Sequence, residues 1–191
     1  MCSDMNNKYN PITGNIIPVF FHYAIPSVIG MLAVSSAVII DGVFVGNFIG
    51  ATALAAINIS MPAFALFASV VYMLAVGGSV MCGKFMGEGN HKAASIIFSK
   101  TVYAVVLITL LVSIFFLLFL DQLVSALGAN EDLHELVTDY MRIIVFAAPL
   151  LVLGLTLDYF VRVDSRPVLA SGVLIAFAMI NISLDYLFIV Q

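Results

Sequence analysis

The sequence has very little charge. Only 9% of its 191 residues are Asp, Glu, Lys or Arg, against roughly 25% in soluble domains, and 63% are hydrophobic, against roughly 45–50%. Residues 42–83 contain no charged side chain at all. A soluble domain of this size needs a polar surface around its core, so this composition excludes one. It predicts an all-α polytopic membrane protein whose surface is covered largely by membrane lipid.

Cysteine is also scarce. Cys2 and Cys82 are the two cysteines, with no CxxC pair and no nearby histidine cluster, so neither a disulfide framework nor a zinc site is predicted. The N-terminus lacks a short apolar run before a small-residue cleavage site. Residues 1–18 are therefore interpreted as a cytoplasmic tail and not as a signal peptide.

Catalytic motifs are missing as well. Residues 78–84 fit the first seven positions of a phosphate-binding loop, but Phe85 stands where Mg²⁺ binding needs Ser or Thr. His134 and Glu135 begin an HExxH motif, but Thr138 replaces the second zinc-binding histidine. We therefore expect no enzyme and no cofactor. The net charge of −4 identifies no partner, and nothing indicates nucleic-acid binding.

Five stretches have the roughly 20 mostly apolar residues that a membrane-spanning helix needs. They cover about 19–40, 52–81, 96–120, 140–160 and 168–190. The second is too long for a perpendicular crossing, so we expect it to tilt, kink or project beyond the lipid.

Basic residues separate the connecting segments into two sets. They precede the first span, lie between or beside the second and third, and lie between the fourth and fifth: Lys8, Lys84, Lys92, Lys100, Arg162 and Arg166. The alternate segments, 41–51 and 121–139, contain neither Lys nor Arg. Because Lys and Arg concentrate on the cytoplasmic side of membranes, we expect the N-terminus inside and the fifth helix running outward.

Prolines and small residues fall within the predicted spans. Pro26, Pro62 and Pro149 each remove a hydrogen bond to the carbonyl four residues earlier, which predicts kinks. Small residues at four-residue spacing predict close helix packing. These are Ala33 and Ala37, followed by Gly42, Gly46 and Gly50.

Two acids interrupt apolar runs. Asp41 and Asp185 each cost roughly 2.5–3.5 kcal/mol if they lie at a helix centre in the bilayer, which makes them functional candidates. At 1.5 Å per residue, Asp41 lies roughly 31 Å along the first span from Phe20, and Asp185 lies roughly 26 Å along the fifth from Val168. Both helices run the same way, so the carboxylates can meet in the outer half of the bilayer. Asn181 shares the helix face of Asp185.

Carboxylate and amide oxygens are hard ligands that suit a hard cation, so Asp41, Asn181 and Asp185 form a candidate site for Na⁺ or a proton. Asn58, near the outer end of the second span, is a candidate for the substrate pathway. Two other interpretations remain open. Asp41 with Gly42 can form a solvated turn at the outer interface, and Asp185 can be a buried group hydrogen-bonded to Asn181 or to another helix.

A further charged pair lies at the inner boundary of the fourth span. Asp158 and Arg162 are four residues apart, which is typical of an ion pair on one helix face. We interpret this pair as structural and assign it no transport role.

Four motifs follow one another along the chain. They are Ala24-Ile-Pro-Ser, Asp41-Gly-Val-Phe-Val-Gly, Gly50-Ala-Thr-Ala-Leu-Ala-Ala and Gly87-Glu-Gly-Asn-His-Lys-Ala-Ala. In order and spacing, from about residue 20 to 190, the chain resembles the MATE (multidrug and toxic compound extrusion) family of transporters, and looks closest to its bacterial DinF-like and MepA-like branch.

The resemblance implies a multi-pass protein of the bacterial plasma (inner) membrane. It implies a secondary antiporter that exports amphipathic, often cationic drugs against Na⁺ or H⁺, with two six-helix lobes. The family's cation-site residues on the first and fifth helices fall on Asp41, Asn181 and Asp185, and the proline that bends the first helix falls on Pro26.

The same resemblance implies that the chain is partial. Residues 19–191 would form a truncated N-terminal lobe of about five helices, whose partner is the missing C-terminal lobe of the same protein. The alternatives are a lipid or peptide flippase of a related fold, and a non-transporting membrane subunit.

Overall fold

The computed structural model describes residues 15–190, and every regular element within them is helical. The elements are α1 (Ile16–Phe44), α2 (Ala51–Gly87), α3 (His91–Leu118), α4 (Leu120–Ala126), α5 (Glu131–Val163) and α6 (Pro167–Asp185), with two short π-helical segments, η2 (Val45–Ile49) and η3 (Tyr186–Val190). Five helical units are long and apolar enough to cross a membrane: Ile16–Ile49, Ala51–Gly87, His91–Leu118, Glu131–Val163 and Pro167–Val190. The predicted fold class and number of spans are confirmed.

The helices extend beyond several of the predicted limits. α1 continues through Phe44, so Asp41 and Gly42 are helical and do not form the turn that we considered. The segment 121–139, expected to connect two spans, contains most of α4 and the beginning of α5. Helix α3 ends at Leu118, two residues before the predicted end of the third span. Apolar runs mark the part of a helix that lies in lipid, whereas its ends depend on capping and packing.

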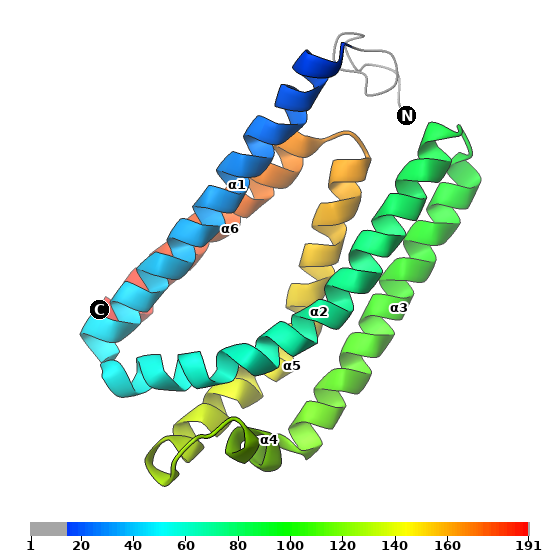
Figure 1. Ribbon diagram of the computed structural model, residues 1–191. Coiled ribbons are helices and arrows are strands. Elements are labelled where there is room, and N and C mark those ends of the chain that lie inside the picture. Colours follow the sequence, from blue (N-terminus) through cyan, green and yellow to red (C-terminus); the bar gives the residue numbers. More distant parts are fainter. Residues whose placement is uncertain (1–14, 191) are drawn as a thin grey trace.

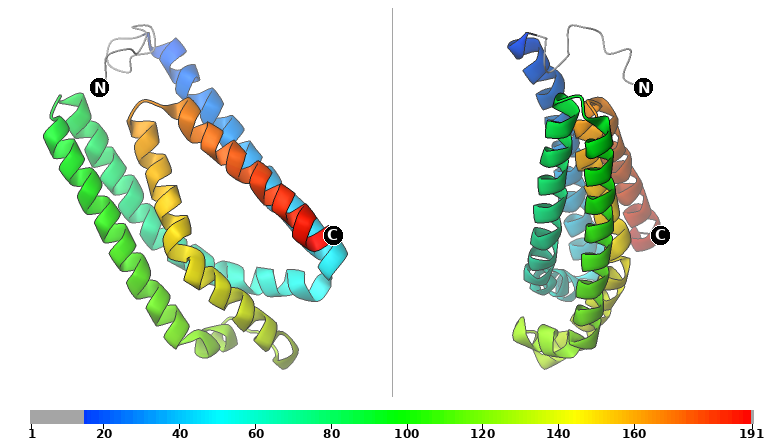
Figure 2. Two further views of the ribbon diagram at one scale, coloured as in Figure 1. Left: turned by 180° about the vertical axis from the view of Figure 1, so that it is seen from behind. Right: turned by 90° about the vertical axis from the view of Figure 1, so that its right-hand side faces the viewer.

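The helices form two groups (Figures 1 and 2). α1 and α6 run side by side in the same direction, and α2, α3 and α5 pack against one another. α1 and α2 meet at one end, through η2, and diverge toward the other end (Figure 1). We call the diverging end the basic end, because Lys84, Lys92 and Arg166 lie at or beside its connections, and the opposite end the acidic end.

The core of the α2, α3 and α5 group consists of three buried clusters arranged along its length. At the acidic end, Val124 of α4 packs with Val137 and Met141 of α5, which explains why this short helix forms. The middle cluster contains Phe67, Val71, Val105, Ala148 and Val152, and the basic-end cluster contains Cys82, Ala94 and Phe160. These contacts fix the three helices relative to one another.

Large apolar side chains also cover much of the outer surface. Examples are Ile143, Phe146 and Leu150 of α5, which are 71–80% exposed. A soluble protein rarely exposes contiguous apolar surface on this scale. The arrangement agrees with a chain whose surrounding solvent is lipid.

Three helices, α1, α2 and α5, have a proline in their interior. α2 and α5 contain Pro62 and Pro149, and both helices change direction along their length (Figures 1 and 2). α1 is continuous across Pro26 and shows no sharp bend in these views. Bending of α1 at Pro26 therefore stays a prediction.

The small residues of α1 pack more selectively than their spacing indicated. Ala37 is buried, but a side-chain carbon added at Gly42 would meet nothing within 4 Å, and Gly50 forms the turn before α2 with a φ of +120°. α1 approaches α6 closely at Gly30, where an added carbon would lie 3.3 Å from Ser171 and Leu174. Gly30 was not in the predicted set.

Candidate functional site

Asp41 and Asp185 lie at the acidic end of two neighbouring helices. Asp41 is three residues before the end of α1, and Asp185 is the last residue of α6. Both side chains are half-buried, and the two acids interact electrostatically. Oδ2 of Asp185 is buried and has no hydrogen-bond partner. The parallel α1 and α6 therefore bring together the two acids that the sequence places 144 positions apart.

Asn181 lies one turn before Asp185 on α6 and is also half-buried. Within residues 15–190 no hydrogen bond joins the side chains of Asp41, Asn181 and Asp185, so the proposed Asn181–Asp185 pair is not formed in this structure. No group of three or more His, Cys, Asp or Glu side chains that could hold a metal ion occurs in the described residues. A cation at this site would depend on the two carboxylates together with amide or hydroxyl oxygens.

Tyr140 of α5 is a further member of this region. Its half-buried side chain interacts electrostatically with Asp41, so α5 also contributes a polar group near the acids. Sequence reasoning missed it because a tyrosine near the end of a predicted span is common at membrane interfaces. Only the packing of the helices indicates its proximity to Asp41.

Each acid is followed by a π-helical segment. η2 begins four residues after Asp41, and η3 begins directly after Asp185. The two segments contact one another, so both helices of the pair widen at the same place. Such π-segments are rare and are frequent at functional sites, because they displace backbone groups from the regular hydrogen-bond ladder.

Asn58 lies in α2 with its side chain exposed. Its amide nitrogen donates to the carbonyl of Leu54 at 2.9 Å, so the amide is held by its own helix. Its role in a substrate pathway stays a prediction.

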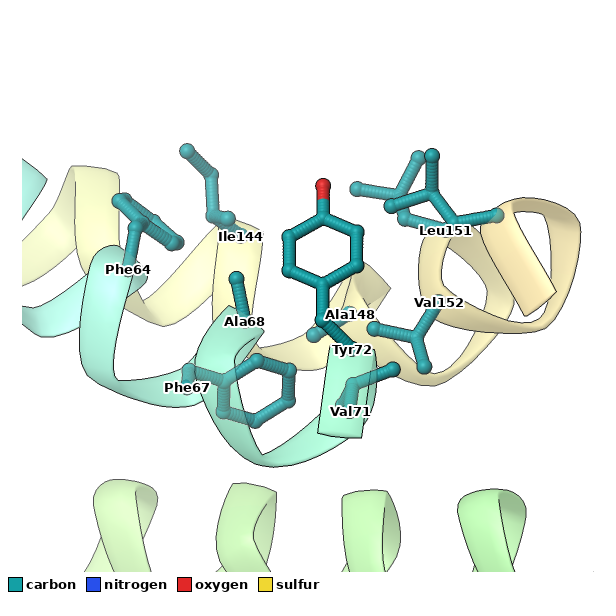
Figure 3. A pocket seen from close by; sticks show the side chains of 10 residues that line it. Phe64, Phe67, Ala68, Val71, Tyr72, Ile144, Ala148, Leu151 and Val152 are labelled. Carbon is teal, nitrogen blue, oxygen red and sulfur yellow. The ribbon is translucent and has the colours of Figure 1, made fainter. Parts of the chain in front are cut away.

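An apolar cavity lies between α2 and α5 (Figure 3). Its volume is about 140 Å³. It is lined by Phe64, Phe67, Ala68, Val71 and Tyr72 of α2 and by Ile144, Ala148, Leu151, Val152 and Leu155 of α5. The hydroxyl group of Tyr72 points away from Phe67 and Val71, and α3 lies on the side of α2 away from that hydroxyl group (Figure 3). Apart from the hydroxyl group of Tyr72, the side chains that line the cavity are apolar.

Taken together, five helices long and apolar enough to span a membrane, half-buried acids at one end and an apolar cavity between two of the helices define a polytopic membrane protein with acidic groups at one end of its helices. The sequence matches the MatE family model over residues 26–187. The chain belongs to the MATE family.

The chain is similar to multidrug export proteins called MepA. It is 25% identical to the protein of Staphylococcus haemolyticus over 171 residues, covering 90% of this chain and 38% of the relative. It is 26% identical to a protein of the same name from Staphylococcus aureus, covering 88% and 38%. The chain therefore spans less than two fifths of the length of these relatives.

A solved structure has the same fold. A crystal structure of MATE in complex with MaD3S superposes with a TM-score of 0.82 and 23% identity, over 87% of this chain and 37% of that one. The expected lobe architecture is confirmed over this part.

Proposed function

We propose that this chain is part of a secondary transporter that exports amphipathic or cationic compounds in exchange for Na⁺ or H⁺. The single observation that carries the proposal is the buried, unpartnered Oδ2 of Asp185 beside Asp41. A buried carboxylate oxygen without a donor loses its hydration and gains nothing in return. Binding of a cation or a proton removes that cost.

The residues fit a small hard cation. Asp41 and Asp185 provide carboxylate oxygens, Asn181 provides an amide oxygen one turn away, and oxygen atoms are the donors that hard cations prefer. A proton can occupy the same place by sharing the two carboxylates. Either ion changes the charge at the ends of α1 and α6, which is the change that a coupled transporter needs.

The cavity between α2 and α5 supports an apolar group of the exported compound. Pockets that enclose a whole drug have volumes of about 300–1,000 Å³, so a cavity of about 140 Å³ holds only part of one. A dry cavity of about 150 Å³ holds a benzene ring. We infer that this cavity takes one ring of the substrate, while its charged part stays in a more polar environment.

The distribution of charge supports a location in the bacterial plasma membrane with the basic end inside. Lys84, Lys92 and Arg166 lie at or beside connections of the basic end, and Glu131 and Asp132 begin α5 at the acidic end. In this orientation the two acids lie in the outer half of the membrane.

The test is the Asp185→Asn variant of the full-length protein in proteoliposomes. We expect ion-driven export of a fluorescent cationic drug to be abolished, with the amount of folded protein unchanged. Asp132→Asn, which alters an exposed acid in the first turn of α5, is the matched control and should keep export. Unchanged export by Asp185→Asn would refute the site.

The coupling ion is identified with the wild-type protein in the same vesicles. Imposing a Na⁺ gradient at fixed pH drives export if Na⁺ is used, and imposing a pH gradient without Na⁺ drives export if the proton is used. If neither gradient drives export, the protein is a membrane subunit without coupled transport and the proposal is wrong.

A further inference from the structure

Arg162 of α5 connects the two groups of helices at the basic end. Its Nη1 donates to Oγ of Ser27 on α1 at 2.7 Å, across 135 positions of sequence. Its Nε donates to Oδ2 of Asp158 at 2.8 Å, and Nη2 lies 3.4 Å from Oδ1 of the same carboxylate. We call Ser27, Asp158 and Arg162 the clasp. It joins α1 to α5 through side-chain hydrogen bonds.

The clasp differs from an ordinary surface ion pair. The side chains of Arg162 and Asp158 are only 20% and 16% exposed, whereas those of Arg142 and Asp139, paired at 3.2 Å elsewhere on α5, are 62% and 61% exposed. An exposed pair contributes little because water competes for both charges. In the clasp two nitrogens of the planar guanidinium group of Arg162 face the carboxylate of Asp158, and the third nitrogen donates to Ser27.

Ser27 is unusual among the helical serines of this chain. Ser60, Ser99 and Ser183 donate to the backbone carbonyl four residues earlier in their own helices, which is the common habit of a helical serine. Ser27 instead accepts a hydrogen bond from Arg162 of another helix. Its hydroxyl is thus a point of attachment between α1 and α5.

Ser27 is next to Pro26, where the hydrogen-bond ladder of α1 is interrupted. Pro26 cannot donate a hydrogen bond to the carbonyl four residues earlier, so the helix bends there more easily than elsewhere. Between Pro26 and the acidic end, α6 packs along α1 and holds it in place. Toward the basic end, α1 diverges from α2 (Figure 1).

We propose that the clasp positions the first part of α1 against α5, so that its release lets α1 bend at Pro26 and widens the basic end. Arg162, oriented by Asp158, is then a positioning residue for the conformational cycle, and Ser27 is its contact on α1. The consequence for transport depends on the function proposed above, but the movement itself does not.

The experiment measures the movement directly in the full-length protein. Spin labels replace Ile17 on α1 and Val80 on α2, two exposed residues toward the basic end, after Cys2, Cys82 and any other cysteine of the full-length protein have been changed to serine. We expect Ser27→Ala, which removes only the hydroxyl, to raise the population of the longer label distance by about tenfold, as loss of a hydrogen bond to a charged group predicts. Arg162→Lys should act likewise, because an ammonium group cannot bridge Asp158 and Ser27 in the same planar geometry.

The control is Arg142→Gln, which breaks the exposed pair on the same helix and should leave the distance distribution unchanged. Ser27→Thr retains the hydroxyl and should restore the wild-type distribution. Identical distributions for wild type, Ser27→Ala and Arg162→Lys would overturn the clasp. If the distributions change but export is absent even in the wild type, the proposed function fails and the clasp stands.

Discussion

The contact between α2 and α3 at Gly78 provides a sharp test of the packing. A side-chain carbon added at Gly78 would lie 2.8 Å from Cβ of Thr101 and would overlap its Oγ1 and Cγ2. Cβ is fixed to the backbone, so rotation of the threonine side chain cannot relieve all of this overlap. Gly78→Ala must therefore push the two helices apart.

The magnitude follows from two opposing effects. Overpacking of a close contact costs about 1–3 kcal/mol. Replacing a helical glycine by alanine stabilises a helix by about 0.8–1 kcal/mol. The neighbouring Gly77 provides the control, because an added carbon there would meet nothing within 4 Å. Gly77→Ala keeps the helix-propensity gain without the overlap, so the two variants should differ by about 1–3 kcal/mol, the overpacking cost alone.

Thermal unfolding of the full-length protein in detergent measures this difference. We expect Gly78→Ala to unfold a few degrees below Gly77→Ala, on the order of the shift that 1–3 kcal/mol produces. Adding Thr101→Ala to Gly78→Ala removes the overlap with Oγ1 and Cγ2 but keeps Cβ, so it should recover part of the loss. Equal melting temperatures of the Gly77 and Gly78 variants would refute the close contact.

Two further predictions concern side chains that the packing places. Cys82 is only 6% exposed, and its thiol lies 3.6 Å from the carbonyl oxygen of Ala94. In a Cys2→Ser background, a maleimide should therefore modify Cys82 at least about a hundredfold more slowly in the folded protein than after denaturation. Mass spectrometry can follow the modification, and equal rates would contradict the burial of Cys82. Phe64→Ala should weaken export of aromatic substrates more than export of aliphatic cations, because it removes a wall of the apolar cavity. Phe146→Ala, on the exposed side of α5, should not weaken export of aromatic substrates selectively. Transport assays with both substrate classes measure this difference, and an equal loss of both would show that the cavity holds no ring.

Much of the fold was predictable because insertion into a membrane depends on local properties of the chain. Runs of apolar residues identified all five spans, and the prediction of an ion pair between Asp158 and Arg162 is confirmed at 2.8 Å. The limits of the helices were less accurate. The helical conformation of Asp41 and the formation of α4 depend on contacts with other helices, which a window of neighbouring residues does not contain.

The candidate site was predictable in part. Asp41 and Asp185 stand out in apolar runs because an ionisable group there is costly, and the common direction of their helices predicted that they could meet. Tyr140 carries no comparable signal, because tyrosine is ordinary near a membrane interface. The cavity between α2 and α5 was also beyond prediction, since its walls are apolar residues of the same kinds as those that face lipid.

The sequence by itself determined that this protein crosses a membrane five times in the part described, which end is basic, and which acids are expensive to bury. These properties follow from the hydropathy and charge of consecutive residues. The tertiary structure alone decided that α1 pairs with α6, that Tyr140 lies near Asp41, and that Arg162 reaches Ser27. The physical reason is that these contacts join residues far apart in the chain. Many helix arrangements satisfy the same apolar pattern, and the absence of a side chain at Gly30 and Gly78 permits the one that packs closely.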